Sequence, residues 1–158
     1  MKFFQLFLAL FFLVFNFAEA ANPTLIGKTL DGKNFDLKEK RGQILIVNFW
    51  ATWCIDCRRE LPILDEIYKD YQAQGLEIIG VSTDRAKDRK KVLEVTTAKK
   101  YVNLLSSDVT KNDFPEVEFL PTSYVIDKDG KLVGEVIVYD RAITKKDFED
   151  ALKPLLTN

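Results

Sequence analysis

Cys54 and Cys57 are the two cysteines of this 158-residue chain, and two residues separate them. They follow an apolar run, residues 44–50, that is typical of a buried strand, and residues 54–71 repeat apolar side chains at helical spacing. The N–H groups and the dipole at the start of a helix stabilise an anion, so they lower the pKa of a thiol there. A spacing of three places both sulfurs on one helix face, close enough for a disulfide. The pattern therefore predicts thiol–disulfide exchange.

The two thiols are expected to act in different steps. Cys54 lies at the start of the predicted helix and should be exposed, so it is the candidate nucleophile. Cys57 lies one turn deeper and should resolve the mixed disulfide by intramolecular attack. A purely structural disulfide is the alternative, but closing so short a loop would contribute only about 2 kcal/mol. A zinc site needs three or four ligands, and two cysteines without a histidine do not supply them, so we expect no metal.

The first twenty residues are typical of an export signal. Residues 3–15 are almost wholly apolar, and small residues at 18 and 20 suit a cleavage site after Ala20. We therefore expect a signal peptide over residues 1–20. The apolar stretch is short for a membrane span, which needs about 20 residues. The alternative is a retained anchor over residues 3–17, and we expect membrane association only in that case.

The rest of the chain, residues 21–158, is expected to form a single domain, since it has no repeat, low-complexity tract or long linker. The chain has 23 Lys and Arg against 24 Asp and Glu, which gives no electrostatic case for nucleic-acid binding. Export together with a cysteine pair indicates an oxidising, periplasmic or otherwise extracytoplasmic compartment. The absence of histidine excludes Ser–His and Cys–His catalysis.

The other elements follow from apolar patterns and turn residues. Asp31-Gly32 predicts a hairpin turn between residues 25–30 and 33–35. After it we expect a short turn capped by Asp36, a strand at 44–51, a helix at 54–71 kinked by Pro62, a strand at 76–82, a helix at 86–100, a strand at 102–105, an irregular segment at 106–120, strands at 122–127 and 132–138, and a helix from Thr144 to 156. This order predicts an α/β fold: a central mixed β-sheet flanked by helices on both faces, with an N-terminal β-hairpin extension.

Two segments carry a resemblance to a known family. Residues 49–62 read FWATWCIDCRRELP and residues 120–130 read LPTSYVIDKDG. Together they resemble the exported TlpA/ResA-type thioredoxin-like proteins of the AhpC/TSA–redoxin superfamily, and the likeness covers roughly residues 24–156. The resemblance implies a thioredoxin-like fold with a redox-active Cys54–Cys57 disulfide and no cofactor.

The resemblance also implies a substrate-binding surface beside the cysteines. It places a cis peptide bond between Leu120 and Pro121, packed against the dithiol, and such a bond exposes neighbouring backbone to a client strand. Leu120, Pro121, Thr122 and Trp53 are therefore candidate substrate-binding residues. The alternative for Pro121 is an ordinary proline at the start of a strand. Trp50 is expected in the core.

Glu60 is a candidate catalytic residue. It lies three residues beyond Cys57 and occupies the position of an acidic residue that related reductases place near their active site. There it could relay a proton to or from the Cys57 thiol. Many cytoplasmic thioredoxins have a buried aspartate where this chain has Asn48, and this departure favours Glu60 as the proton acceptor. An ordinary glutamate on an exposed helix is the alternative.

Ile55 and Asp56, the two residues between the cysteines, are candidate redox-tuning residues. A negative charge at Asp56 disfavours the thiolate, so it destabilises the reduced form and favours an electron donor. Arg58 and Arg59 oppose this effect.

The pattern as a whole predicts an extracytoplasmic protein-disulfide reductase that exchanges thiols with protein substrates and receives electrons from an upstream membrane donor. The resemblance implies cytochrome c maturation or the maintenance of exported thiols. A peroxiredoxin-like peroxidase is one alternative, but the chain lacks the Pro-x-x-x-Thr-x-x-Cys pattern. A binding module or metallochaperone is another, although copper-delivery relatives have wider cysteine spacing and a histidine. Phe114, Val117 and Phe119 are expected to border the substrate groove.

Overall fold

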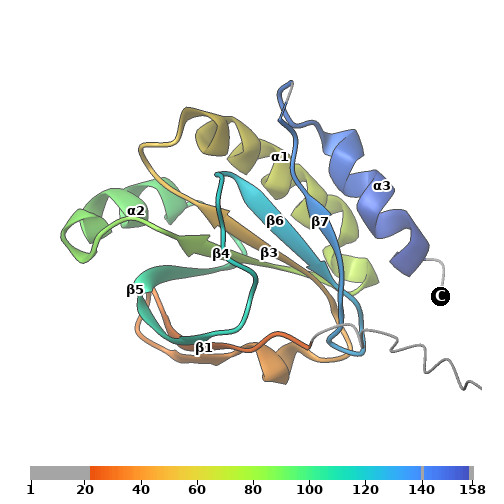
Figure 1. Ribbon diagram of the computed structural model, residues 1–158, viewed down its shortest axis with the longest axis horizontal. Helices are drawn as coiled ribbons and strands as arrows, with labels where there is room; N and C mark the ends of the chain where they lie inside the picture. Colours follow the sequence, from red (N-terminus) through yellow and green to blue (C-terminus); the bar gives the residue numbers. More distant parts are fainter. Residues whose placement is uncertain (1–21, 140, 157–158) are drawn as a thin grey trace, which may run out of the picture.

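The structure is a computed structural model that describes residues 22–139 and 141–156, so the predicted signal peptide, residues 1–20, lies outside the described residues. Figure 1 shows how the elements follow one another along the chain. In order they are β1 (Leu25–Thr29), β2 (Asn34–Asp36), the 3-10 helix η1 (Leu37–Lys40), β3 (Ile44–Trp50), α1 (Ile55–Tyr71), η2 (Gln72–Gln74), β4 (Leu76–Ser82), η3 (Ala86–Asp88), α2 (Arg89–Thr96), β5 (Val102–Asn112), β6 (Thr122–Ile126), β7 (Leu132–Val136) and α3 (Lys145–Leu156).

The strands form one mixed sheet in the order β2-β1-β5-β4-β3-β6-β7. Strand β3 is central: β4 pairs with it in parallel, and β6 pairs with it antiparallel on the other side. All seven β3 residues are buried, as predicted from their apolar character on both faces. The β1–β2 hairpin turns at Gly32, whose φ of 84° suits glycine, and this confirms the predicted N-terminal extension.

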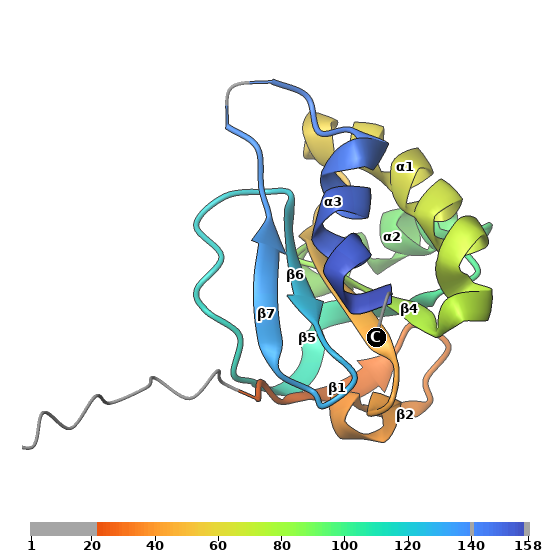
Figure 2. The same cartoon turned by 90° about the vertical axis from the view of Figure 1, so that its right-hand side faces the viewer.

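The helices are distributed unevenly over the two faces of the sheet. Side chains of α1, α2 and α3 all belong to one buried cluster with Ile44, Ile46 and Trp50. The second cluster is covered by Leu37 of η1 and by Phe114. Figure 2 shows α1 and α3 side by side over one face. Helices on both faces were expected, and this holds only through the short helix η1.

Strand β5 departs from prediction because residues 106–112 were expected to be irregular. The strand instead continues to Asn112: its first part pairs in parallel with β4, and its remainder pairs antiparallel with β1 across two irregularities in register. The second part is mostly exposed, so the sequence there is polar and carries no alternation of buried side chains. Of residues 106–121, only 113–121 lie outside a regular element.

Two predicted helix limits are corrected or confirmed by side-chain hydrogen bonds. The helix expected over residues 86–100 is shorter: η3 and α2 end at Thr96, whose hydroxyl donates to the Val92 carbonyl. The last helix begins where predicted, since the Thr144 N–H and hydroxyl both donate to Asp147, each at 2.7 Å. Helix α1 continues past Pro62 to Tyr71. Because a continuous helix can be straight or bent, the predicted kink stays a prediction.

Candidate active site

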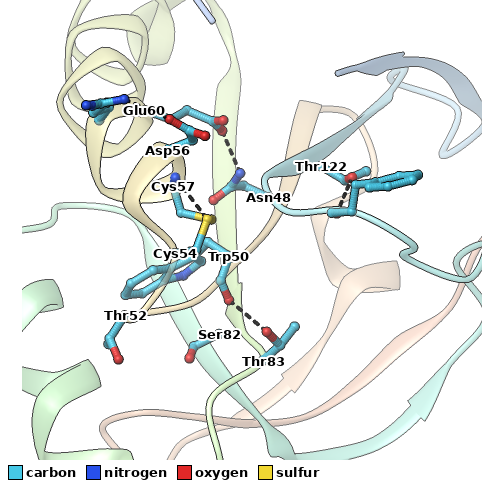
Figure 3. Close-up of a disulfide and its surroundings, with 12 residues drawn as sticks. Asn48, Trp50, Thr52, Cys54, Asp56, Cys57, Glu60, Ser82, Thr83 and Thr122 are labelled. Carbon is cyan, nitrogen blue, oxygen red and sulfur yellow. Dashed lines mark hydrogen bonds and ion pairs between the residues drawn. A yellow bond between two sulfur atoms is a disulfide. The ribbon is translucent and has the colours of Figure 1, made fainter. Parts of the chain in front are cut away.

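The two cysteines form a disulfide at the junction of β3 and α1, with the sulfurs 2.11 Å apart. Cys54 is the N-cap of α1, and the backbone N–H of Cys57 donates to its sulfur at 3.1 Å (Figure 3). Cys57 is fully buried, whereas Cys54 is 8% exposed. Cys54 was expected to be exposed. It is the more accessible of the two, but in the disulfide form it is largely buried and belongs to the same buried cluster as Ala51 and Cys57.

Asp84 holds the turn that presents Cys54. Its carboxylate, 3% exposed, accepts hydrogen bonds from the Thr52 N–H at 2.8 Å, the Thr52 hydroxyl at 2.6 Å and the Ser82 hydroxyl at 2.7 Å. The next residue back, Thr83, donates from its N–H to the Trp50 carbonyl at 2.8 Å. The loop after β4 thus fixes the loop after β3, because parallel strands end at the same edge of the sheet.

Sequence reasoning missed this contribution of Asp84. The signal was present in the polar run Ser82-Thr83-Asp84, which directly follows an apolar strand. Two neighbouring parallel strands bring their carboxyl ends together, so this run had to lie beside the residues that precede Cys54.

Glu60 lies one turn beyond Cys57 on α1, and it is 1% exposed rather than on an exposed helix face. Its Oε1 accepts from the Asn48 amide at 2.7 Å and from the Ser123 hydroxyl at 3.4 Å, and Asn48 also donates to Ser123 at 3.0 Å. The other oxygen, Oε2, is buried without a hydrogen-bond partner among the described residues. Burial raises the pKa of Glu60 to about 8, and the Ser123 hydrogen bond offsets only part of this effect.

A carboxyl group with this pKa is matched to thiol chemistry. An unperturbed cysteine thiol has a pKa of about 8.5, so a proton can pass between it and Glu60 with little change in free energy. Because Glu60 is largely neutral at pH 7, it also adds little negative charge beside the sulfurs. The arrangement therefore provides a buried proton donor and acceptor on the side of Cys57.

The residues between and around the cysteines face outward. Trp53 is 70% exposed, and Ile55 is also highly exposed. Asp56 is exposed and forms an ion pair with Arg59 at 3.0 Å, so part of its charge is balanced within α1. Trp50 is in the core, as predicted.

The predicted substrate-binding segment lies at the start of β6. The Leu120–Pro121 peptide bond is cis, as the resemblance implied. Thr122 is buried, and its hydroxyl donates to the Phe119 carbonyl at 2.8 Å (Figure 3). Phe49 of β3 pairs with Thr122, which brings the segment to the same end of β3 as the turn before Cys54.

The three apolar residues expected at the substrate groove have different positions. Phe114 is buried against Phe49 and Tyr124, with ring centroids 5.8 Å and 5.3 Å away, so it is a core residue. Val117 is partly buried beside the same cluster. Only Phe119 is exposed, where it forms an edge-to-face contact with Tyr139 at 5.6 Å.

Other kinds of site are not apparent in the described part of the chain. Within residues 22–139 and 141–156, no three His, Cys, Asp or Glu side chains gather in a way that could hold a metal ion. No helix in these ranges has the length and apolar character needed to cross a bilayer. The arrangement around Cys54 and Cys57 is thus the candidate site: a cystine at a helix start, a clamped approach loop and a buried carboxyl group.

Comparison with known proteins gives consistent matches over most of the chain. The sequence model of the AhpC/TSA family matches residues 18–135. A relative described as thiol-disulfide oxidoreductase ResA from Bacillus thuringiensis (strain Al Hakam) is 33% identical over 133 residues, which cover 84% of this chain and 75% of the relative.

Solved structures with similar folds are also thiol-exchange proteins by their descriptions. A thiol:disulfide interchange protein of the thioredoxin family from Chlorobium tepidum has a TM-score of 0.67 and 29% identity, covering 85% of this chain and 94% of the other. The exposed lipoprotein thioredoxin Etrx1 of Streptococcus pneumoniae has a TM-score of 0.66 and 25% identity, covering 84% and 99%. The fold is therefore thioredoxin-like, as expected from the two sequence motifs.

Proposed function

The chain belongs to the AhpC/TSA family and is a thiol–disulfide oxidoreductase, and we propose that it reduces disulfides of selected exported proteins. Buried Glu60, on the side of Cys57, is the observation that carries this proposal. A disulfide catalyst is oxidising when its environment strongly stabilises the thiolate, because the reduced form is then favoured. Here the Asp56 carboxylate between the cysteines works against thiolate charge, and Glu60, largely protonated at pH 7, supplies no positive charge that would stabilise a thiolate.

The proposed cycle begins with the reduced protein. The Cys54 thiolate, held by the Cys57 N–H, attacks a client disulfide, so one client sulfur leaves as a thiolate and takes a proton. Cys57 then passes its proton to the fraction of Glu60 that is ionised and attacks the Cys54 sulfur, and the second client sulfur leaves as a thiolate that takes up a proton. Two electrons have passed from the dithiol to the client, and the protein is left with the Cys54–Cys57 disulfide.

Client recognition is proposed to involve the surface around Cys54. Exposed Trp53 offers a flat apolar face, and Leu120, Pro121 and Thr122 are proposed to bind client backbone next to the cystine. Ile55 and Asp56 are proposed to tune the potential. No cofactor enters this cycle.

The setting of the reaction is proposed from the sequence. A signal peptide over residues 1–20 would direct the domain, residues 21–158, to an extracytoplasmic compartment, where a membrane protein would return electrons to the disulfide. The description of the similar protein Etrx1 as an exposed lipoprotein supports such a location. Cytochrome c maturation or upkeep of other exported thiols are the proposed roles.

Two measurements test the proposed function. The reduction potential, from equilibration with dithiothreitol, is expected nearer to the value of about −270 mV for thioredoxin than to about −120 mV for the oxidant DsbA. A potential near the second value would overturn the reductant direction. Cys57→Ala should accumulate a mixed disulfide with the client in cells, which identifies the client, while Cys54→Ala should accumulate none.

A further inference from the structure

We propose that a groove beside Cys54 binds acidic residues of the client, next to the disulfide that is reduced. The groove lies between the first turns of α1 and helix α2 and has a volume of about 690 Å³. It is called the α1–α2 groove here, and its lining includes Trp53, Arg58, Leu61, Lys91, Glu94 and Lys99. This inference rests on the proposed function and specifies the client class.

The α1–α2 groove is adjacent to the reacting sulfur. Trp53 directly precedes Cys54, and Arg58 directly follows Cys57. Figure 1 shows α2 next to the turn that leads from β3 into α1. A client whose disulfide reaches Cys54 therefore brings its neighbouring residues to this groove.

The lining of the groove is positively charged. Arg58 is exposed and has no ion pair among the described residues. Lys91 is also exposed, with only a loose contact of 3.6 Å to Asp88, whereas Lys99 is held by Asp65 at 2.5 Å. Glu94 is the acidic residue of the lining. Arg58 and Lys91 thus remain available to a carboxylate.

The basic character extends along the segment that forms this side of the site. Residues 85–100 contain seven Lys and Arg and two acidic residues, and an excess of basic residues remains after Arg89 pairs with Asp108 and Lys99 with Asp65, although the whole chain has a formal net charge of −1. Such a local excess of one charge attracts a partner of opposite charge and speeds its encounter. The groove therefore selects clients by charge, in addition to the apolar contact that Trp53 offers in its lining.

The opposite side of the cystine has the opposite charge. From residue 114 to Pro121 the acidic residues are Glu116 and Glu118, with no Lys or Arg, whereas Asp113 is paired with Lys111 at 3.3 Å. The sheet order places β4, which leads to α2, on one side of β3 and β6, which follows residues 113–121, on the other. Acidic client residues are thus attracted to the α1–α2 groove and repelled from the other side, which fixes the direction in which the client lies.

The test uses three synthetic peptides with the same intramolecular disulfide loop, flanked by three Glu, three Ser or three Lys. Oxidation of the reduced protein by each peptide is followed by tryptophan fluorescence, which gives its rate constant. The Glu peptide should react at least about threefold faster than the Ser peptide and the Lys peptide slowest. The differences should shrink in 1 M salt, where charges are screened beyond about 3 Å.

Two exposed lysines provide the variant and its control. Lys91→Glu should remove or reverse the preference for the Glu peptide. Lys28→Glu, on β1 at the far side of the sheet, changes the net charge equally and should retain the preference. Equal rates for the three peptides, or an unchanged preference in Lys91→Glu, would overturn this inference alone. If the Ser peptide is not reduced either, the proposed function itself fails.

Discussion

The two sulfurs of the cystine have contrasting surroundings, although they are bonded to each other. Cys54 lies at the surface end of α1, near exposed Trp53 and the cationic α1–α2 groove. Cys57 is fully buried one turn away, on the helix that carries Glu60 toward Asn48 and Ser123. One sulfur thus lies where a protein client can be recognised, and the other lies where a proton can be held away from water.

This contrast explains how one short helix turn can carry out two tasks. Client access and proton transfer place opposite demands on solvent exposure, and a spacing of three residues separates them by one turn. The clamp from Asp84 to Thr52 belongs to the outer half, since it fixes the loop before Cys54.

The largest effect is expected from Glu60→Gln in the inner half. The pKa of Glu60 is about 8 in the folded protein and near its ordinary value of 4.5 when unfolded. The folded state binds the proton more tightly, so wild-type stability should fall as pH rises from about 4.5 through 8. The loss should amount to roughly 3–4 kcal/mol between pH 5 and pH 8.

Urea unfolding of the oxidised proteins at pH 5 and pH 8 measures this effect. Glu60→Gln should lack this part of the pH dependence and gain stability relative to the wild type as pH rises. Glu66→Gln, an exposed position on the same helix, should follow the wild-type curve. Parallel pH curves for wild type and Glu60→Gln would show that Glu60 is ionised in the folded state.

The next effect concerns the difference in reactivity between the two thiols. In the reduced protein at pH 7, iodoacetamide should modify Cys54 about fiftyfold faster than Cys57, since Cys54 is more accessible and the Cys57 N–H, which donates to its sulfur in the disulfide, should stabilise its thiolate. Mass spectrometry of time points gives both rates. Unfolding in urea should make the rates similar, and similar rates in the folded protein would contradict the assigned order of attack.

A smaller effect is expected from Asp84→Asn in the outer half. The asparagine amide has the shape of the carboxylate but only one acceptor oxygen. It therefore cannot accept all three hydrogen bonds that Asp84 receives from the Thr52 N–H, the Thr52 hydroxyl and the Ser82 hydroxyl. We expect a loss of about 2 kcal/mol in unfolding free energy and slower insulin reduction. Asp129→Asn, in the exposed turn between β6 and β7, should change neither quantity, and wild-type behaviour of Asp84→Asn would refute the clamp.

The smallest effect is expected from Phe119→Ala. Removing this exposed ring should raise KM for a protein client about threefold with little change in kcat, because Phe119 is expected to border the substrate groove and to play no part in the exchange itself. Val133→Ala removes an exposed apolar side chain at the other end of the sheet, near the β6–β7 turn, and should leave KM unchanged. A fall in kcat alone would argue against a binding role.

Local signals in the sequence were sufficient for the centre of the fold. The apolar run of β3, the cysteines at the helix start and the Thr144–Asp147 cap each depend on neighbouring residues, and the structure contains all three. The cis bond before Pro121 came from the family resemblance, since an isolated proline does not reveal it.

Features that depend on distant pairing were not predictable in the same way. The second half of β5 is a strand because β1 pairs with it, and its polar residues gave no periodic signal. The burial of Glu60 depends on Asn48 and Ser123, which come from two other strands. Asp84 contacts Thr52 across 32 positions, through the register of β3 with β4. Predicting each of these three features would have required knowing which strands are neighbours in the sheet.

The N-cap role of Cys54 has a consequence for how the protein registers its own redox state. The Cys57 N–H uses the Cys54 sulfur as its acceptor, so the partner of this amide is the atom whose bonding changes in every cycle. A thiolate is a stronger hydrogen-bond acceptor than a disulfide sulfur. In the mixed disulfide, Cys54 is bonded to a client sulfur in place of Cys57, so the environment of the amide differs from that in both other states. The chemical shift and deuterium exchange of this single amide should therefore distinguish the reduced form, the disulfide form and the mixed disulfide with a client in solution.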